Sequence, residues 1–357
     1  MSIVAMFGMD AVNPGYFTYH WRQLGGSAVQ YEQQTIVPGA GRFGGGCLRL
    51  WNDRPLHIQP LENNTNRVGI GGWFKHDGVR NYTGKIMRFT DGTTVQASLG
   101  LNASTGYLYW YRQNDVNYGN SGAEILAPGT WYWLEAACTV GNAGVGDFEV
   151  RVNNTLIHGD NTQDFQGSSA YCNGGQIEGP GNYSDNYGYW DDVVMWVDDG
   201  SGHEGFLGDL GGDIRIDCLL PTGDGANQDW TRSAGVNSYA LVDDPFSAAA
   251  GTSEYLASAT PGDLCDLSFG GLNAQASRVL AVDTFSAAHK PGYAAKSARL
   301  NVKSGATTVN GQAIHLPAHA SVMRYTKNPI LELDPDTSLS WSQSGAENMT
   351  VQLELLA

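Results

Sequence analysis

The amino-acid sequence predicts an all-β protein built from two antiparallel β-sandwich domains. The chain has 357 residues and 47 glycines, and no Gly-X-Y period orders them, so the glycines indicate many tight turns. Only 16% of the residues are charged, below the usual share of about 25%, whereas helix surfaces are rich in Glu, Lys and Arg. Short alternating segments bounded by turn residues recur along the chain, which is typical of strands.

The first part of the chain is predicted to consist of strands and turns throughout. Apolar strands are expected at 69–75 and 85–89, and a bulky one at 129–136. Residues 107–111 alternate between tyrosine and Leu or Trp, so one face of that strand carries tyrosine and the other is apolar.

The clearest local motif is a predicted β-hairpin over residues 147–157. The apolar side chains Phe148, Val150 and Val152 alternate with charged ones and therefore share one face. Asparagine tolerates positive φ, so Asn153-Asn154 can form the primed turn that a two-residue hairpin needs.

A closing strand at 189–197 is expected to end the first domain, which gives domains of residues 1–200 and 201–357. The segment 198–212 is rich in Gly and Asp and is predicted to be a linker or an irregular crossover. No helix longer than two turns is expected anywhere in the chain. Further strands are predicted at 213–219, 278–283, 298–302 and 348–355.

Composition limits the function classes. The net charge of −16, with no cluster of Lys and Arg, argues against nucleic-acid binding. The start of the chain lacks a basic region followed by an apolar stretch, and no run of about 18 apolar residues occurs, so neither a secretory signal nor a membrane span is predicted. The five widely spaced cysteines contain no CxxC pair and fit synthesis in a reducing cytoplasm.

Residues 1–200 resemble the concanavalin A-like, laminin-G-like jelly roll. The order of short motifs carries this resemblance: Phe7-Gly8-Met9-Asp10, Cys47-Leu48-Arg49-Leu50, Gly72-Trp73-Phe74, Gly129-Thr130-Trp131-Tyr132, the Asn153-Asn154 hairpin and Trp190-Asp191-Asp192-Val193-Val194.

The second half resembles a recurrent segment of bacteriophage virion proteins. The matching residues are Phe206-Leu207-Gly208-Asp209, Ile214-Arg215-Ile216, Pro221-Thr222-Gly223-Asp224-Gly225, Asp229-Trp230-Thr231, Leu241-Val242-Asp243-Asp244-Pro245, and the tail from Ile330 to Trp341. This resemblance implies a structural protein of the virion, associated with the tail as fibre, baseplate or collar, and it brings no catalytic residues with it.

The sequence offers little support for catalysis. Jelly-roll glucanases place two carboxylates on one strand as Glu-x-Asp-x-x-Glu, and that pattern is absent. Asp147 and Glu149 share a strand face but look like a solvated outer surface beside Arg151. No HExxH, Gly-x-Ser-x-Gly or P-loop pattern occurs. We therefore expect a chain that is not an enzyme and needs no cofactor.

Acidic side chains give weak candidates for Ca²⁺ binding. Asp191 and Asp192 are adjacent, so on a regular strand they point to opposite faces, and hydrogen bonding to a loop backbone is the simpler role. A second acidic group lies among turns and is expected to cap them: Asp224, Asp229, Asp243 and Asp244. His315 and His319 are spaced for one helix face, but Pro317 lies between them and argues against a zinc site.

The aromatic residues are the better binding candidates. Sugars stack on aromatic rings, and tyrosine is also enriched in cores and protein interfaces, which is the simpler explanation. The candidates for a glycan site or an interface are Tyr107, Tyr109 and Tyr111 on one strand, and Tyr183, Tyr187 and Tyr189 in and after one loop.

These observations predict a non-enzymatic virion protein that assembles with other virion proteins as a homo-oligomer. The alternatives left open are an adhesin that binds a glycan on the host surface, and a polysaccharide depolymerase. The position in the virion does not follow from the fold.

Overall fold

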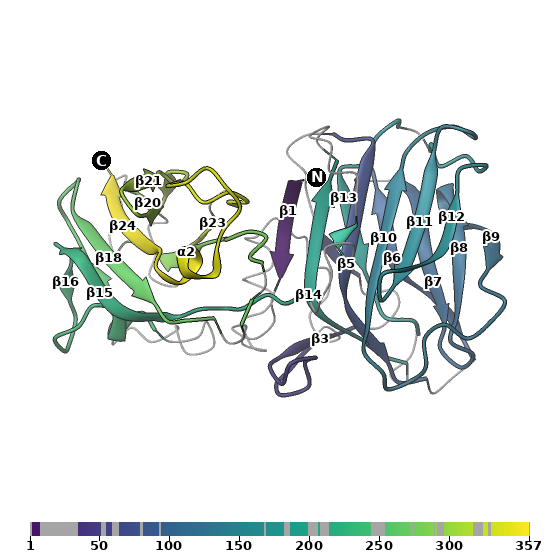
Figure 1. The fold of residues 1–357 in the computed structure, drawn as a ribbon, viewed down its shortest axis with the longest axis horizontal. Helices are drawn as coiled ribbons and strands as arrows, with labels where there is room; N and C mark the ends of the chain where they lie inside the picture. The colour runs from purple at the N-terminus through teal and green to yellow at the C-terminus, as the bar shows by residue number, and fades with distance from the viewer. Residues whose placement is uncertain are drawn as a thin grey trace. The chain divides into compact units, whose positions relative to one another are not determined.

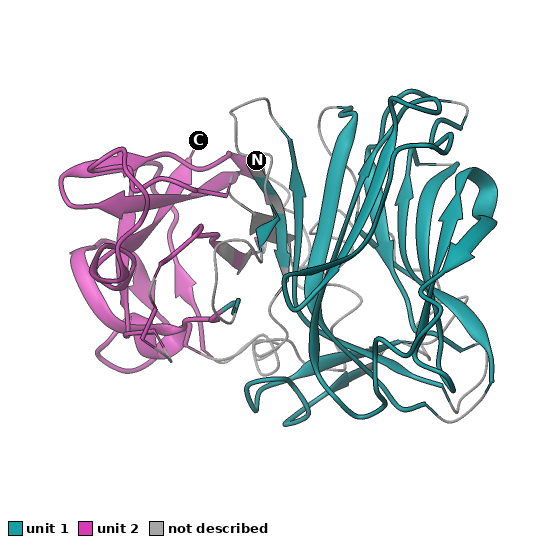
Figure 2. Cartoon of the chain, turned by 45° about the vertical axis from the view of Figure 1, so that its right-hand side comes forward, with its two compact units in different colours: residues 1–10, 17–216 teal, residues 11–16, 217–357 magenta. Residues whose placement is uncertain are grey.

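The computed structural model is nearly all β, as the sequence predicts, and divides into two compact units (Figures 1 and 2). It describes residues 2–7, 35–50, 55–58, 64–78, 81–92, 94–167, 169–181, 186–198, 206–207, 214–243, 254–272, 275–276, 278–288, 290, 296–316, 324–327 and 330–356. One unit ends at Ile216, beyond the expected boundary at residue 200, and the other runs from Asp217 to Ala357.

The first unit is a sandwich of two antiparallel sheets, which Figure 2 shows as two facing layers. Its first sheet has the order β12-β11-β10-β5-β14-β3-β2, and β1 also pairs with β14. The strands are β1 (Ser2–Phe7), β2 (Thr35–Val37), β3 (Cys47–Leu50), β5 (Arg67–His76), β10 (Tyr132–Thr139), β11 (Asp147–Val152), β12 (Thr155–Asp160) and β14 (Gly188–Val197).

The second sheet of this unit has the order β4-β13-β6-β7-β8-β9. The strands are β4 (Leu56–Ile58), β6 (Thr83–Thr90), β7 (Val95–Asn102), β8 (Tyr107–Arg112), β9 (Val116–Asn120) and β13 (Gly174–Ile177), and the 3-10 turn η1 (Gln113–Asp115) joins β8 to β9. Apolar side chains from both sheets, such as Phe74, Phe89 and Phe148, are fully buried in the core.

The predicted hairpin is confirmed. Strands β11 and β12 are joined by Asn153 and Asn154, whose φ values of 47° and 66° are those of a primed turn. The Asn153 side chain also accepts a hydrogen bond from the backbone N–H of Trp133 at 2.9 Å. Along β11, burial alternates as the sequence predicts, with Phe148 and Val150 in the core.

Part of the outer face of the first sheet is covered by residues 206–207 and 214–216, which were predicted to belong to the linker or the second domain. Phe206 and Leu207 are buried, and the Leu207 N–H donates to Glu135 Oε1 at 2.7 Å. The same carboxylate oxygen accepts the indole N–H of Trp196 at 3.0 Å. The indole N–H of Trp73 donates to the carbonyl of Ile214 at 2.7 Å. These contacts explain why the first unit extends to Ile216.

The second unit contains an antiparallel sheet of order β15-β18-β24-β20-β21, with β22 paired to β20, and two short ribbons, β16-β17 and β19-β23. The elements are β15 (Pro221–Gln228), β16 (Thr231–Arg232), η3 (Tyr239–Leu241), β17 (Leu256–Ala257), β18 (Leu264–Phe269), β19 (Phe285–Ala288), β20 (Ser297–Ser304), β21 (Thr307–Val309), β22 (Ile314–His315), β23 (Arg324–Lys327), α2 (Gln343–Glu347) and β24 (Thr350–Leu356).

Two of the four strands expected in the second half are confirmed, at 298–302 in β20 and 348–355 in β24. The strand expected at 213–219 is wrong over its described part, because residues 214–219 are irregular. The N–H of Ile216 donates to Asp192 Oδ1 at 2.9 Å instead of joining a sheet. At 278–283 the described residues contribute only an isolated bridge from Val282.

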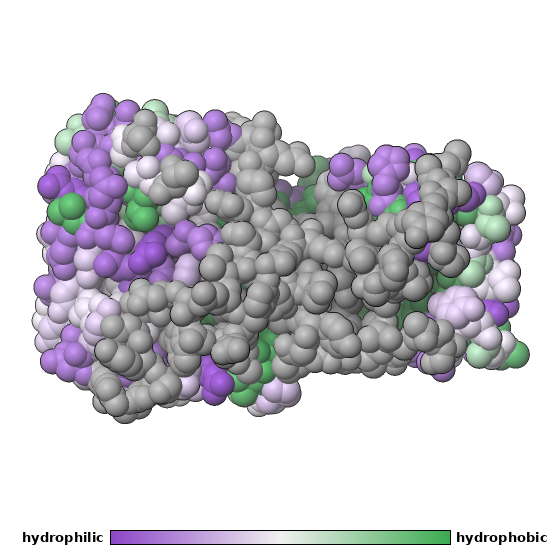
Figure 3. Space-filling view, turned by 180° about the vertical axis from the view of Figure 1, so that it is seen from behind, coloured by the Kyte–Doolittle hydropathy of each residue, from purple (hydrophilic) through white to green (hydrophobic). Residues whose placement is uncertain are grey.

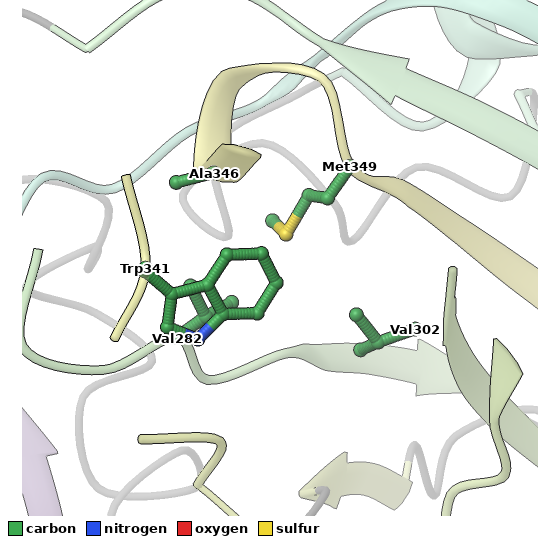
Figure 4. Close-up of a cluster of buried hydrophobic side chains, with 5 residues drawn as sticks. All are labelled: Val282, Val302, Trp341, Ala346 and Met349. Carbon is green, nitrogen blue, oxygen red and sulfur yellow. The ribbon is translucent and has the colours of Figure 1, made fainter. Parts of the chain in front are cut away.

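A buried cluster lies in the second unit (Figure 4). Trp341 packs there with Val282, Val302, Ala346 and Met349, and its indole N–H donates to the carbonyl of Leu331 at 2.8 Å. No helix in the described parts of either unit is long and apolar enough to cross a membrane.

Candidate functional site

The outer face of the six-stranded sheet carries a concentration of titratable side chains. Strand β8 shows how the sequence pattern produces this face. Leu108 and Trp110 point into the core and are buried, whereas Tyr107, Tyr109 and Tyr111 lie on the opposite face, as their alternation predicts. Tyr107 and Tyr109 are half-buried, and Tyr111 is only 7% exposed because neighbouring strands contribute long side chains around it.

One row of polar residues crosses all strands of this sheet. Strand register pairs each residue of the row with the next, so neighbouring side chains share one face and lie about 5 Å apart. The row is His57, Gln176, Arg88, Ser98, Tyr111 and Asn117, on β4, β13, β6, β7, β8 and β9.

Lys85 adds an amine to this row. Its ammonium nitrogen lies 3.8 Å from the centroid of the Tyr111 ring. Gly100 on the intervening strand β7 makes this contact feasible, because a Cβ at Gly100 would lie 2.7 Å from Tyr111 Cε2. The missing side chain therefore leaves space in which Lys85 and Tyr111 meet.

A β-bulge places Lys85 and Arg88 on the same face. Residues three apart on a regular strand point to opposite sides. Here the register shifts between Lys85 and Met87, so that Lys85 pairs with Gly100 and Arg88 pairs with Ser98. Since Gly100 and Ser98 share one face of β7, both basic side chains lie on the polar face.

Two carboxylates hold the guanidinium of Arg88. Its Nη1 lies 3.0 Å from Glu178 Oε1, and its Nη2 lies 3.7 Å from Asp115 Oδ2. Asp115 has a φ of 60° in η1 and accepts a hydrogen bond from Ser98 Oγ at 2.5 Å. Within the described part of the chain, Arg88 Nε is buried without a hydrogen-bond partner.

The opposite end of the row is neutral. The Gln176 amide nitrogen, which can only donate, lies 3.1 Å from His57 Nδ1, so this ring nitrogen is the acceptor. Burial and the nearby charge of Arg88 lower the pKa of His57, which keeps the imidazole neutral. Among the described residues, Gln176 Oε1 is buried without a hydrogen-bond partner.

Burial shifts the two central groups in opposite directions. Desolvation lowers the pKa of Lys85, with Arg88 adding to the decrease and Asp115 opposing it. Desolvation raises the pKa of the Tyr111 phenol, although a hydrogen bond with Asn117 acts against this. A more easily deprotonated amine therefore lies beside a phenol that keeps its proton, which is an arrangement suited to moving protons.

The structure separates the tyrosine candidates into two places. Tyr107, Tyr109 and Tyr111 lie on the polar face of the second sheet. Tyr187 and Tyr189 belong to the first sheet, before and within β14. Tyr183 lies outside the described residues.

Asp191 and Asp192 are both buried at 3% exposure and accept backbone hydrogen bonds. Asp191 Oδ2 accepts the N–H of Arg42 at 2.8 Å, and Asp192 Oδ1 accepts that of Ile216. Asp192 has a φ of 48° at the irregularity between Asp191 and Val194, so the regular alternation assumed from sequence does not apply. Among the described residues, no group of three acidic, His or Cys side chains is placed to hold a metal ion.

Asp224 and Asp229 accept backbone hydrogen bonds, as expected of residues that cap turns. Asp224 accepts the N–H groups of Ser238 and Tyr239 at the start of η3, and Asp229 accepts that of Leu264. Asp244 lies outside the described residues, as does His319.

The carboxylates of Asp147 and Glu149 both face the guanidinium of Arg67. The shorter contact, from Arg67 Nη2 to Glu149 Oε2, is 2.7 Å. This pair therefore belongs to an ion-pair network on the outer face of the first sheet.

Lys85, Arg88, His57 and Gln176 are not among the site residues predicted from the sequence. The signal available was the pair of basic residues within the strand predicted at 85–89. These two residues lie on one face only because the strand bulges between Lys85 and Met87. His57 and Gln176 are neighbours only because β4 pairs with β13.

No protein-family model and no curated protein matches this sequence. Solved structures show similarity in fold. An endo-β-1,4-glucuronan lyase from the fungus Trichoderma reesei is 10% identical, with a TM-score of 0.39, covering 48% of this chain and 90% of that one. Alginate lyase vAL-1 from Chlorella virus is 10% identical, with a TM-score of 0.40, covering 55% and 100%. The carbohydrate-binding module CBM66 from Bacillus subtilis is 10% identical, with a TM-score of 0.32, covering 48% and 96%.

The prediction that this chain is not an enzyme is corrected by these comparisons, because the matched structures include polysaccharide lyases. The prediction rested on the missing carboxylate pair of a glycosidase, on the absence of HExxH, Gly-x-Ser-x-Gly and P-loop patterns, and on a resemblance that brings no catalytic residues. An elimination reaction needs a base and a proton donor, not that pair, so the missing motif does not exclude catalysis.

Proposed function

We propose that the first unit binds an acidic polysaccharide across the polar face of its six-stranded sheet and cleaves it by β-elimination. The observation that carries the proposal is the contact between Lys85 and Tyr111 in a row that also presents Arg88 and Gln176. A base, a proton donor and a cation on one face are the groups that elimination beside a carboxylate requires.

The reaction assigns one role to each central residue. The neutral amine of Lys85 removes the proton from the sugar carbon that bears the carboxylate. The electrons of that C–H bond form a double bond to the next ring carbon, and the glycosidic C–O bond to this carbon breaks. The phenol of Tyr111 donates its proton to the leaving oxygen. Both residues begin in the required protonation state more readily because burial lowers the pKa of Lys85 and raises that of Tyr111.

An acidic sugar fits this face better than a neutral one. Removal of a proton beside a carboxylate builds negative charge on the carboxylate oxygens, which cations and N–H donors stabilise. Arg88 supplies the cation of this face and is held there by Glu178 and Asp115.

Turnover of sodium alginate, polyglucuronate and polygalacturonate tests the proposal, with neutral dextran as the control polymer. The unsaturated product absorbs ultraviolet light because its new double bond is conjugated with the carboxylate. We expect Lys85→Arg, which keeps a cation but cannot supply a neutral amine, to lower kcat at least about 100-fold. Tyr111→Phe should do the same, because it keeps the ring and removes the proton.

Matched controls come from the second unit. Lys303→Met and Tyr239→Phe change the same residue types away from this face and should leave turnover unchanged. Thermal unfolding confirms that each variant folds. Turnover that survives both Lys85→Arg and Tyr111→Phe contradicts the assignment, as does a wild-type chain that cleaves none of the acidic polymers.

The glycan-binding adhesin differs from this function in one respect, since it binds the polymer without releasing product. The role in a phage virion, with other virion proteins as partners and a homo-oligomeric state, stays a prediction from sequence. A virion protein that degrades a host-surface polysaccharide would combine both, and mass spectrometry of purified particles tests the virion part separately.

A further inference from the structure

A second row of cations and aromatic rings lies on the outer face of the other sheet of the sandwich. Strand register aligns Arg49 on β3 with Tyr189 on β14, and Tyr189 with Lys75 on β5. Trp131, just before β10, and Tyr187, just before β14, extend this row, which we call the cation–aromatic row.

Each cation of the row contacts a ring. The Lys75 ammonium lies between two rings, 4.6 Å from the centroid of Trp131 and 4.9 Å from that of Tyr189. The Arg49 guanidinium carbon lies 4.5 Å from the Tyr187 centroid. The Tyr187 and Tyr189 rings meet edge to face, with centroids 6.4 Å apart. All these side chains are half-buried, so they present partly exposed edges and charges at fixed positions.

Neither cation is neutralised by a carboxylate in the described part of the chain. Ion pairs are present there for Arg67, Arg88, Arg232 and Arg299, but not for Arg49 or Lys75. Arg49 Nε is buried and has no hydrogen-bond partner among the described residues. The nearby carboxylate of Asp77 accepts the backbone N–H of Tyr187, at 3.0 and 3.1 Å from its two oxygens.

We propose that the cation–aromatic row is a second binding surface for an anionic polysaccharide, separate from the candidate active site. Two strand steps place Arg49 and Lys75 about 10 Å apart on a straight line, with Tyr189 between them. An extended chain of acidic sugars can lay rings against the aromatic side chains and direct charged groups to the two cations. Arg49 and Lys75, which form no ion pair with a described carboxylate, give this row the opposite charge to such a polymer, in a chain whose net charge is −16.

The substrate class rests on the proposed function, but the row itself does not. The two surfaces occupy the outer faces of different sheets, so one polymer-binding surface can be removed while the other is kept. Binding at both would raise the apparent affinity for long polymers without any new contact at the active site.

Affinity electrophoresis of the full chain in gels containing sodium alginate tests the proposal, with polyphosphate and dextran gels alongside. The Tyr111→Phe background keeps the polymer intact. Adding Arg49→Met and Lys75→Met together should weaken binding to alginate at least about tenfold. Adding Lys303→Met instead removes a positive charge elsewhere and should not.

Unchanged alginate binding in the Arg49→Met, Lys75→Met variant overturns the proposal, and so does an equal loss with Lys303→Met. Equally tight retardation by polyphosphate means that the row recognises charge alone, which also overturns it. If the wild-type chain binds alginate through this row but releases no product, the proposed catalytic function is refuted. The proposal of a second binding surface is then still supported. Thermal unfolding distinguishes a loss of binding from a loss of folding.

Discussion

Lys85 and Tyr111 meet across Gly100, with the Lys85 ammonium nitrogen 3.8 Å from the centroid of the Tyr111 ring. The two residues come from β6 and β8, which do not pair with each other, because β7 lies between them. The glycine on β7 lets the long amine side chain reach the ring, and the β6 bulge directs that amine to the correct face. The proposed chemistry depends on this geometry.

Gly100→Ala should therefore lower turnover without unfolding the chain. The added Cβ would lie 2.7 Å from Tyr111 Cε2 and 3.1 Å from the Gly84 carbonyl oxygen, so the Tyr111 ring has to move. We expect kcat on acidic polymers to fall about tenfold or more, as misplacement of a catalytic group does. Gly119→Ala on β9 is the control, because its nearest contact, Trp110 Cδ1, is 3.2 Å away. An equal effect of both changes on kcat would contradict this role for Gly100.

The pH profile of kcat/KM should be bell-shaped, with both its rising and its falling limb at alkaline pH. Activity rises as Lys85 loses its proton, and burial moves this step below the ordinary lysine pKa of 10.5. Activity falls as Tyr111 ionises, and burial moves that step above the ordinary tyrosine value of 10.0. Initial rates across this range, with ionic strength held constant, measure both limbs. A rising limb at or above the ordinary lysine pKa would refute Lys85 as the base.

Trp196→Phe should destabilise the first unit. The change removes the indole N–H that donates to Glu135, a fully buried carboxylate, and loss of a hydrogen bond to a buried charge costs about 1.5–3 kcal/mol in the free energy of unfolding. Trp230→Phe in the second unit loses a bond to a neutral carbonyl, that of Asp263, and should cost less. Urea unfolding measures the free energy of unfolding of both variants. Equal losses would mean that the hydrogen bond to Glu135 stabilises the fold no more than the one to the Asp263 carbonyl.

The Asn153-Asn154 turn predicts opposite effects of two substitutions. At Asn154, with a φ of 66°, glycine should be neutral or slightly stabilising, whereas valine should cost about 1–2 kcal/mol because a β-branched residue strains this conformation. Thermal unfolding measures both changes. A valine variant as stable as the asparagine original would mean that the hairpin adopts a different turn.

The sequence was sufficient for features that depend on neighbouring residues. Alternation predicted the β11 strand and the tyrosine face of β8, and the backbone preference of asparagine predicted the turn that follows β11. On the face that Figure 3 shows, the described surface of the first unit is mostly hydrophilic.

The candidate site could not be predicted in the same way. His57 and Gln176 are neighbours only because β4 pairs with β13, and Lys85 shares a face with Arg88 only because the strand bulges. The attachment of Leu207 to Glu135 likewise joins positions far apart in the chain, which is why the first unit extends past the composition change near residue 200. Each of these relations arises from tertiary pairing and leaves no periodic pattern in the sequence.

The mass of the released products tests the central claim most directly. Elimination yields oligosaccharides whose new nonreducing end is lighter by one water than the product of hydrolysis, because a double bond replaces the added hydroxyl and hydrogen. Mass spectrometry of digests by the wild-type chain should show these unsaturated ends, and Tyr111→Phe should remove them. Saturated ends with the mass expected of hydrolysis would contradict a lyase centred on Lys85 and Tyr111. So would the absence of products from every acidic polymer.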